Sequence, residues 1–385
     1  MKKKIVLIAT LAIALILPLT ISVEKADADA ILFPWLALDS DISTIISIVN
    51  TAEALDGQDP ELHYEYYHKP DITNDQGDTC QNSSFKRPTS KDDLVTFDAA
   101  GNINSGKPMF NDPGAGIGVT YGTNTFKLNV DLPRRAYLLV DNNTPSHILG
   151  TPSTNVDGTM YGEAMVIDLD NGAAWGYIAY NASGGAGTSQ SGDVDFGDGM
   201  DVLGEVIGEL ETTQTVLMNP TTIGTRFFLT PADSDNQRKG NTESNIDFCI
   251  TPDGNGECLN DNRGIWLNDE DSLDFKKTKN IDCTSGDDVR LLLSEAAWNT
   301  LIDEGRHGWV NIVINANQTP DDPDGMIIGK LEWTATGITF EDVTVSDPIN
   351  NFVWLRDSGT VAGVVGINAI HNCQKTPGTC DLPTN

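Results

Sequence analysis

Two stretches between residues 43 and 70 restrict the fold of this chain more than any other feature. Residues 43–49 (Ser-Thr-Ile-Ile-Ser-Ile-Val) are rich in β-branched side chains and carry apolar side chains on both faces, which is typical of a strand buried on two sides. Residues 62–70 alternate, with Leu62, Tyr64 and Tyr66 on one face and His63, Glu65 and Tyr67 on the other. This alternation predicts an antiparallel strand with one face in the core and with His63 and Glu65 in solvent.

Further strand patterns follow along the chain. Residues 93–98 alternate again, and residues 135–140 form an apolar stretch that predicts a core strand. Residues 162–169 and 174–180 flank Asp-Asn-Gly, and Asn-Gly between two alternating stretches is a strong signal for a β-hairpin. Together these patterns predict an all-β protein built from antiparallel sheets.

The order of these signals recurs in the second half of the chain. Five pairs of stretches match in the same order: 46–50 with 215–219, 65–70 with 226–231, 135–140 with 309–314, the strands holding Gly162 and Gly329, and 174–178 with 351–355. The series favours a duplicated sandwich-like unit, although a long all-β chain also produces such similarities by chance.

We therefore expect two antiparallel β-sandwich domains of the immunoglobulin-like or jelly-roll-like kind. The first spans residues 31–192 and the second residues 206–385, and the acidic, glycine-rich residues 193–205 link them. The alternative is a single large sandwich with long insertions. One short helix is expected in the second domain at residues 287–304, where apolar side chains form one stripe and Gly305 ends the pattern.

The first 30 residues have the pattern of a secretory signal peptide. Lys2, Lys3 and Lys4 precede an apolar stretch that Pro18 interrupts, and residues 26–30 (Ala-Asp-Ala-Asp-Ala) contain small residues at cleavage-site spacing. An uncleaved anchor is the alternative, because the apolar stretch is long for a signal peptide. No later stretch is long and apolar enough to predict a membrane span in the mature chain. The protein is therefore expected outside the cell, at the cell surface or in the periplasm.

The chain is strongly acidic. Its 385 residues include 56 Asp and Glu against 24 Lys and Arg, a net charge of −32. Such a charge repels nucleic acid and anionic membrane surfaces, so both are excluded as partners. Solubility outside the cell and cation binding remain as explanations.

Six cysteines in an exported chain predict three disulfides. Cys373 with Cys380 and Cys249 with Cys258 would each close a short turn containing Pro and Gly. Cys80 and Cys283 then pair by elimination, which would connect the two predicted domains. His371, Cys373 and Cys380 as ligands of a soft metal are the less favoured interpretation.

An acidic glycine-rich loop is the best local candidate for a metal site. It carries Asp193, Asp195, Asp198 and Asp201, and closely spaced carboxylates suit Ca²⁺, which prefers several oxygen ligands. The match to an EF-hand loop is poor, and a solvated acidic linker is the alternative. A weaker cluster consists of Asp321, Asp322 and Asp324, where the neighbouring prolines favour a plain turn.

Signals for catalysis are weak. His63 and Glu65 share one face of a strand, at a spacing that suits metal binding or acid–base chemistry, but such a pair usually only covers a solvated face with polar groups. The motifs of hydrolases, zinc proteases and nucleotide-binding loops are absent, so no catalytic residue and no certain cofactor is predicted. Tyr67, Trp175 and Tyr177 could form a platform for sugar rings, although aromatic residues on strands more often belong to the core.

Four stretches resemble parts of uncharacterised secreted bacterial β-sandwich proteins: residues 43–49, 62–70, 87–98 and 134–142. The resemblance covers mainly the first half and rests on core residues, so it implies a fold and no activity. We expect a non-enzymatic exported protein with a structural, adhesive or surface-assembly role, which contacts surface polymers or other exported proteins. The alternative is a secreted protein that binds or cleaves carbohydrate.

Overall fold

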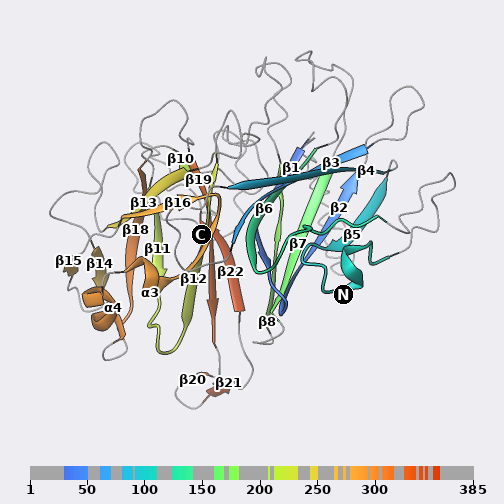
Figure 1. Ribbon diagram of the computed structural model, residues 1–385. Coiled ribbons are helices and arrows are strands. Elements are labelled where there is room, and N and C mark those ends of the chain that lie inside the picture. The colour runs from blue at the N-terminus through green and yellow to red at the C-terminus, as the bar shows by residue number, and fades with distance from the viewer. Residues whose placement is uncertain are drawn as a thin grey trace, which may run out of the picture.

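The structure is a computed structural model. It describes residues 30–50, 61–70, 80–89, 92–110, 124–141, 160–168, 173–181, 207–208, 212–232, 243–249, 264–267, 272–274, 278–293, 295–302, 306–315, 325–334, 338–340, 343–345 and 350–355. The predicted signal peptide up to residue 29 and the predicted linker 193–205 lie outside these residues. The protein is mostly β, and its four large sheets are antiparallel, as the alternating patterns predicted (Figure 1).

The first half of the chain forms two sheets. Sheet A has the order β4-β3-β6-β1-β9, from the strands Gln81–Pro88, Glu61–Pro70, Arg134–Asp141, Ala30–Leu38 and Tyr180–Asn181. Sheet B has the order β5-β2-β7-β8, from Asp93–Asp98, Ile42–Asn50, Met160–Asp168 and Ala173–Ile178. Ile46 and Ile48 of sheet B share one core cluster with Leu62, Tyr64 and Tyr66 of sheet A, which confirms the predicted interior.

The second half forms the other two sheets. Sheet C has the order β10-β19-β12-β17, with β22 also paired to β19, from Ile207–Gly208, Gly325–Trp333, Gly224–Ala232, Ser285–Asp288 and Asn350–Leu355. Sheet D has the order β15-β14-β18-β13-β16, with β11 also paired to β18, from Ser272–Asp274, Gly264–Leu267, Gly308–Asn315, Glu243–Cys249, Thr278–Asp282 and Thr212–Leu217. A small hairpin joins β20 (Ile338–Phe340) to β21 (Val343–Val345).

Both halves repeat one pairing scheme. In the first half β3 pairs with β4 and β6, β2 pairs with β5 and β7, β1 pairs with β6, and β7 pairs with β8. In the second half β13 pairs with β16 and β18, β12 pairs with β17 and β19, β11 pairs with β18, and β19 pairs with β22. The described strands of the two halves are therefore equivalent one by one, except β9 in the first half and β10, β14, β15, β20 and β21 in the second.

This equivalence corrects two of the five sequence matches. The stretch 215–219 was matched with 46–50, but β11 occupies the position of β1, not that of β2. The stretch 226–231 was matched with 65–70, but β12 occupies the position of β2. Neighbouring strands of a sandwich have similar apolar patterns, so a shift by one strand becomes visible only when the pairing partners are known. The other three matches join equivalent strands.

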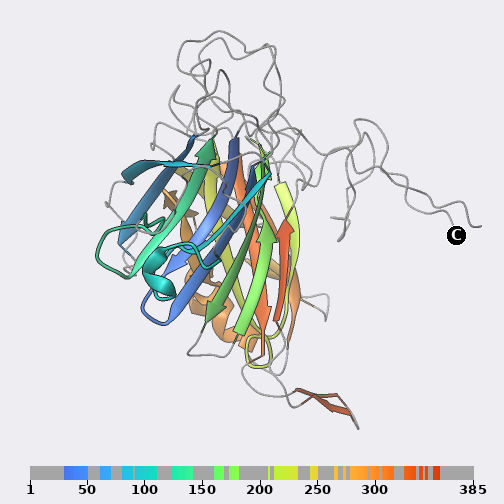
Figure 2. The same ribbon diagram turned by 90° about the vertical axis from the view of Figure 1, so that its right-hand side faces the viewer.

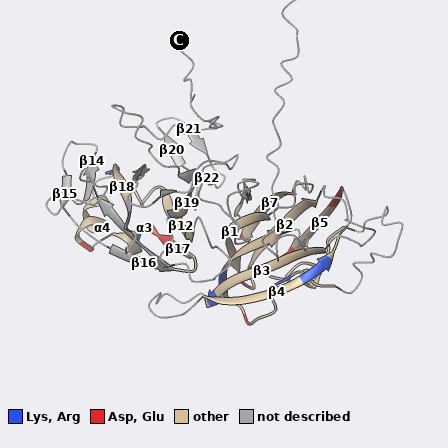
Figure 3. Cartoon of the chain, turned by 90° about the horizontal axis from the view of Figure 1, so that it is seen from above, with Lys and Arg blue, Asp and Glu red and all other residues tan. Residues whose placement is uncertain are grey.

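The two halves contact each other through packed side chains and hydrogen bonds, in addition to their covalent connection along the chain. The indole ring of Trp35 in β1 lies 3.8 Å from the ring of Phe228 in β12, measured between centroids, and Thr230 donates a hydrogen bond to the carbonyl oxygen of Pro34. The strands β8 and β22 lie side by side (Figures 1 and 2). Figure 3 shows the second sandwich beside the edge of the first that contains β1.

The predicted helix is shorter and interrupted. The segment contains α3 (Val289–Leu292) and α4 (Glu295–Ile302), and Leu293 between them is extended, with φ −104° and ψ 155°. Asp287 and Asp288, expected in the first helical turn, belong to β17. Leu293 is buried in the second core, so tertiary packing overrides the continuous helical pattern. The first half contains a single turn of 3₁₀ helix, η1 (Asn104–Gly106).

The outer side of β3 differs from its prediction. The side chains of His63 and Glu65 are only 17% and 15% exposed, and Tyr67 is buried. The ring of Tyr67 stacks on Tyr137 at 4.8 Å between centroids, and its hydroxyl donates to Glu65 at 3.0 Å. The prediction that His63 and Glu65 lie in solvent is therefore wrong, because alternation along one strand cannot reveal that its second face is also covered.

Candidate functional site

The outer face of sheet B holds more exposed large apolar side chains than any other sheet face among the described residues. Along β7, Ala164 and Val166 point into the core, whereas Tyr161 and Met165 point outward. Four large apolar side chains on this outer face keep a high exposed fraction: Leu94 56%, Tyr161 41%, Met165 44% and Ile178 39%, whereas Ile45 opposite Met165 is buried. We call these four side chains the sheet B patch.

The strand register explains why these side chains gather. Val49 lies in the middle of one row, opposite Leu94 on one side and Tyr161 on the other. In the next row Glu163 lies between Ser47 and Ile178. Because directly opposed residues of antiparallel strands point to the same face, the patch residues of β5, β7 and β8 lie on one face, with the half-buried Val49 of β2 between Leu94 and Tyr161.

A hollow of about 400 Å³ opens on this face between β7 and β8. Residues 163–165 of β7 and 174–178 of β8 line it. The hollow exists because Ala174 and Gly176 place almost no side chain on the outer side of β8. A Cβ atom at Gly176 would lie 2.9 Å from the carbonyl oxygen of Ala164, so the position suits glycine.

One charged side chain, Glu163, stands beside the patch residues on β7. The hydroxyl of Tyr161 donates a hydrogen bond to the Glu163 carboxylate. Partial burial raises the pKa of Tyr161 to about 12, and the hydrogen bond and negative charge of Glu163 act in the same direction. The phenol therefore stays neutral, and its side chain is 41% exposed.

The opposite side of β8 faces the interior. Trp175 stacks against Phe228 with 6.3 Å between the ring centroids, and Tyr177 donates a hydrogen bond to the carbonyl oxygen of Trp35. Tyr67 is buried as well. Of the three aromatic residues considered for a sugar platform, Tyr67 and Tyr177 are thus buried and Trp175 packs against the core half-buried. The exposed aromatic residue of sheet B is Tyr161, which the sequence analysis did not single out. The alternating stretch predicted from the sequence covered residues 162–169, which leaves out Tyr161, and alternation could not show which face is outside.

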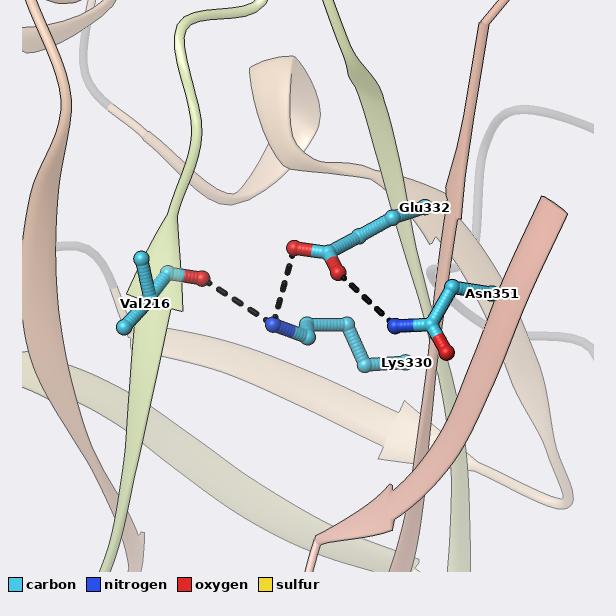
Figure 4. A network of polar contacts seen from close by, with 4 residues as sticks. All are labelled: Val216, Lys330, Glu332 and Asn351. Atoms are coloured by element: carbon cyan, nitrogen blue, oxygen red, sulfur yellow. Dashed lines mark hydrogen bonds and ion pairs between the residues drawn. The ribbon is translucent and has the colours of Figure 1, made fainter. Parts of the chain in front are cut away.

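A group of polar side chains in the second sandwich connects strands of different sheets. In the second sandwich the ammonium group of Lys330 donates to the carbonyl oxygen of Val216 at 3.2 Å and to Glu332 at 2.9 Å (Figure 4). Asn351 donates to the other oxygen of Glu332 at 3.2 Å. This network joins β11 of sheet D to β19 and β22 of sheet C. A half-buried ion pair whose charged groups also form hydrogen bonds stabilises the fold more often than it forms a reactive site.

The contact between His63 and Glu65 also fits a structural role better than a reactive one. The Nε2 atom of His63 lies 3.4 Å from Glu65, whose second oxygen accepts the hydrogen bond from Tyr67. Within the described residues, no group of three His, Cys, Asp or Glu side chains is arranged to hold a metal ion. Two potential ligands alone make a weak metal site, so the pair adds no metal centre to the described face.

The predicted calcium site lies outside the described residues and stays a prediction. This holds for Asp193, Asp195, Asp198 and Asp201 and for the weaker cluster of Asp321, Asp322 and Asp324. His371 and Cys373 also lie outside the described part of the chain.

The disulfide that connects the two halves is confirmed. Cys80 and Cys283 are bonded, with 5.1 Å between their Cα atoms and a sequence separation of 203. Cys258, Cys373 and Cys380 lie outside the described residues, and the side chain of Cys249 is not described, so the two short-range pairs stay predictions.

No protein-family model and no curated protein sequence matches this chain. Among the helices of the described residues, none has the length and apolar character needed to cross a membrane.

Proposed function

We propose that this protein is exported and non-enzymatic, with a structural or surface-assembly role, and that the outer face of sheet B is its binding surface. The observation that supports this role is the sheet B patch, four large apolar side chains on a rigid sheet beside a hollow of about 400 Å³. Exposed apolar surfaces of this kind mark interaction sites on soluble proteins. The predicted signal peptide and the resemblance to secreted β-sandwich proteins belong to the same proposal.

The geometry favours binding over catalysis. A flat apolar sheet face with one carboxylate offers contact area and little acid–base chemistry. The partner is another exported protein or a surface polymer, in a compartment where the predicted disulfides form. The net charge of −32 keeps the protein soluble and repels anionic partners, which leaves neutral or cationic ones.

Carbohydrate binding is the second candidate, and one observation favours it. Tyr161 presents its ring on the open face and holds its hydroxyl against Glu163, so a sugar ring could stack on the phenol while its hydroxyl groups donate to the carboxylate. This arrangement has one exposed aromatic ring, which is less than a long sugar chain would need for stacking along the sheet.

One experiment separates the two candidates. Purified protein would be tested against isolated envelopes of the producing cells and, in parallel, on a glycan array with a reducing-sugar assay. We expect envelope binding that the variant Met165→Asp loses and that the matched control Asn129→Asp, which adds the same charge in an exposed loop, retains. Glycan binding that disappears in Tyr161→Ala would favour the carbohydrate function, and release of reducing sugar would contradict the non-enzymatic role.

A further inference from the structure

Three side chains with complementary chemistry meet on the inner face of sheet C. Lys330 and Glu332 are two residues apart on β19, so they point to the same side of the sheet. Asn351 of β22 lies directly opposite Glu332 in the strand register and shares that side. Ile328, on the same side of β19, belongs to the core of the second half. The three side chains therefore lie on the side of sheet C that faces sheet D.

One carboxylate binds both nitrogen atoms. The Nζ atom of Lys330 donates to one oxygen of Glu332 at 2.9 Å, and the amide nitrogen of Asn351 donates to the other at 3.2 Å. Figure 4 shows the carboxylate between the amine and the amide. The carboxamide distinguishes this network from an ordinary ion pair. An amine that can act as a nucleophile, an amide that can accept it and a carboxylate that can carry protons are in contact.

Burial shields the amine from water. Lys330 is 6% exposed, and Val353, directly opposite it on β22, packs against the second core. The side chain of Glu332 is 16% exposed, whereas Asn351 is exposed. A site that excludes water suppresses hydrolysis as a side reaction. The exposed side of Asn351 gives a small leaving group a path to solvent.

The strand register keeps the amine near the amide. Lys330 lies diagonally across from Asn351, because Asn351 pairs with Glu332 two residues further along β19. Diagonal neighbours on antiparallel strands are about 7–8 Å apart, a separation that long side chains span. Rotation about side-chain bonds can therefore bring Nζ to the amide carbon without moving either strand. Two reacting groups held on one sheet react faster than the same groups free in solution.

We propose that Lys330 and Asn351 become joined by a covalent isopeptide bond, with Glu332 as the proton carrier. Glu332 takes a proton from the Lys330 ammonium, and the neutral amine attacks Cγ of Asn351. The Nζ–Cγ bond forms and the Cγ–Nδ2 bond breaks. Of the three protons on the ammonium, one stays on the new amide and two pass through Glu332 to the leaving nitrogen, which departs as ammonium. No atom is oxidised or reduced, so the reaction needs no cofactor.

The bond would attach β22 to β19 in a way that survives denaturation. It goes beyond the proposed function and does not depend on the sheet B patch. Such a bond suits an exported protein with a structural role, since it joins two paired strands without any partner or enzyme.

Intact mass of the purified, fully reduced chain tests the inference. We expect a mass lower than the sequence requires by one molecule of ammonia. Trypsin should not cleave after Lys330, and tandem mass spectrometry of the digest should find the peptides of Lys330 and Asn351 joined.

Three variants identify the groups that react. Lys330→Arg keeps the positive charge beside Glu332 and removes the amine, so it should have the full mass. Glu332→Gln removes the proton carrier and should also have the full mass. Lys86→Arg is the matched control, because it replaces an exposed lysine on β4 and should keep the loss of ammonia. Circular dichroism of each variant checks that the strands are intact.

The wild-type chain alone decides the main point. A full sequence mass with no joined peptide would overturn the inference, whether or not the variants fold. Loss of ammonia that persists in Lys330→Arg would overturn it as well, because another amide of the chain would be its source. A joined peptide in Glu332→Gln would show that the bond forms without the proposed proton carrier, and the role given to Glu332 would be wrong.

Discussion

At the scale of single residues, His68 in β3 is the clearest case of a titratable side chain that is buried although its charged form favours water. It is 1% exposed, and its Nε2 atom lies 3.2 Å from the hydroxyl of Ser83. Its Nδ1 atom has no hydrogen-bond partner among the described residues. Burial lowers the pKa of His68 from 6.5 to about 4, and the positive charge of Arg134 contributes in the same direction.

The pKa of His68 predicts a loss of stability in mild acid. The unfolded chain binds a proton at this position below about pH 6.5, whereas the folded protein resists it down to about pH 4, so stability falls progressively across that window. We expect His68 to contribute about 1–2 kcal/mol to the difference in unfolding free energy between about pH 7 and about pH 5. Urea unfolding at both pH values should show a smaller difference for His68→Gln. Equal pH dependence in the variant would contradict the assignment.

Substitutions at core and at half-buried positions of the first sandwich should lower the free energy of unfolding by different amounts. Ile48→Ala removes a fully buried side chain between sheets A and B and should cost about 2–5 kcal/mol. Glu65→Ala loses the contacts with His63 and Tyr67 and should cost about 1 kcal/mol, more than a solvent position would. Chemical denaturation of the two variants beside the wild type measures both. A larger loss for Glu65→Ala would mean that the register of β3 is wrong.

At the scale of elements, β1 connects the two sandwiches. Its register with β6 shifts between Phe33 and Leu36, which marks a bulge at Pro34 and Trp35. Proline lacks the N–H group that a regular ladder needs, so it is tolerated at such an irregularity. The carbonyl oxygen of Pro34 accepts the hydrogen bond from Thr230, and Trp35 contacts Phe228. The bulge therefore allows one strand to fill the first core and to contact the second half.

Packing of β1 on β7 requires a glycine at position 162. A Cβ atom there would lie 2.6 Å from Phe33 and 2.8 Å from Ile31. We expect Gly162→Ala to cost about 1–3 kcal/mol, as overpacking of a core does. Gly286→Ala is the matched control, because its Cβ atom would lie 3.2 Å from Trp35 and should be accommodated at a smaller cost. Thermal unfolding compares the two variants, and equal midpoints would show that β1 can move.

At the scale of the whole molecule, the disulfide and the packing between the halves act together. Cys80 precedes β4 at the edge of sheet A, and Cys283 precedes β17 at the edge of sheet C. Next to Cys283, the hydroxyl of Thr284 lies 2.8 Å from that of Thr230, which also contacts β1. The covalent link thus lies beside a packed contact, so the two sandwiches should behave as one cooperative unit.

Removing the disulfide should lower stability without separating the halves. The double variant Cys80→Ala, Cys283→Ala opens a long loop and should lose about 2–5 kcal/mol. Because Trp35, Phe228 and Leu331 still share one core cluster, calorimetry should record a single unfolding transition in both the wild type and the variant. Two separate transitions in the variant would mean that the disulfide alone couples the sandwiches.

Several properties followed from the sequence alone because they depend on local patterns. Alternation over residues 62–70 predicted an antiparallel strand and its core face, since successive side chains of a strand point to opposite sides. The recurring order of strand signals predicted the repeated unit, and cysteine counting predicted the bond between Cys80 and Cys283. Each of these inferences uses only neighbours in the chain or a count.

Only the tertiary structure decided which of two apolar faces is covered, because burial depends on segments that are distant in sequence. Tyr67 proved buried and Tyr161 exposed, although both alternate with apolar neighbours on their strands. The helical pattern after Asp288 is interrupted because Leu293 packs into the second core. The sheet B patch belongs to the same class: its residues come from β5, β7 and β8, and strand pairing alone brings them to one face.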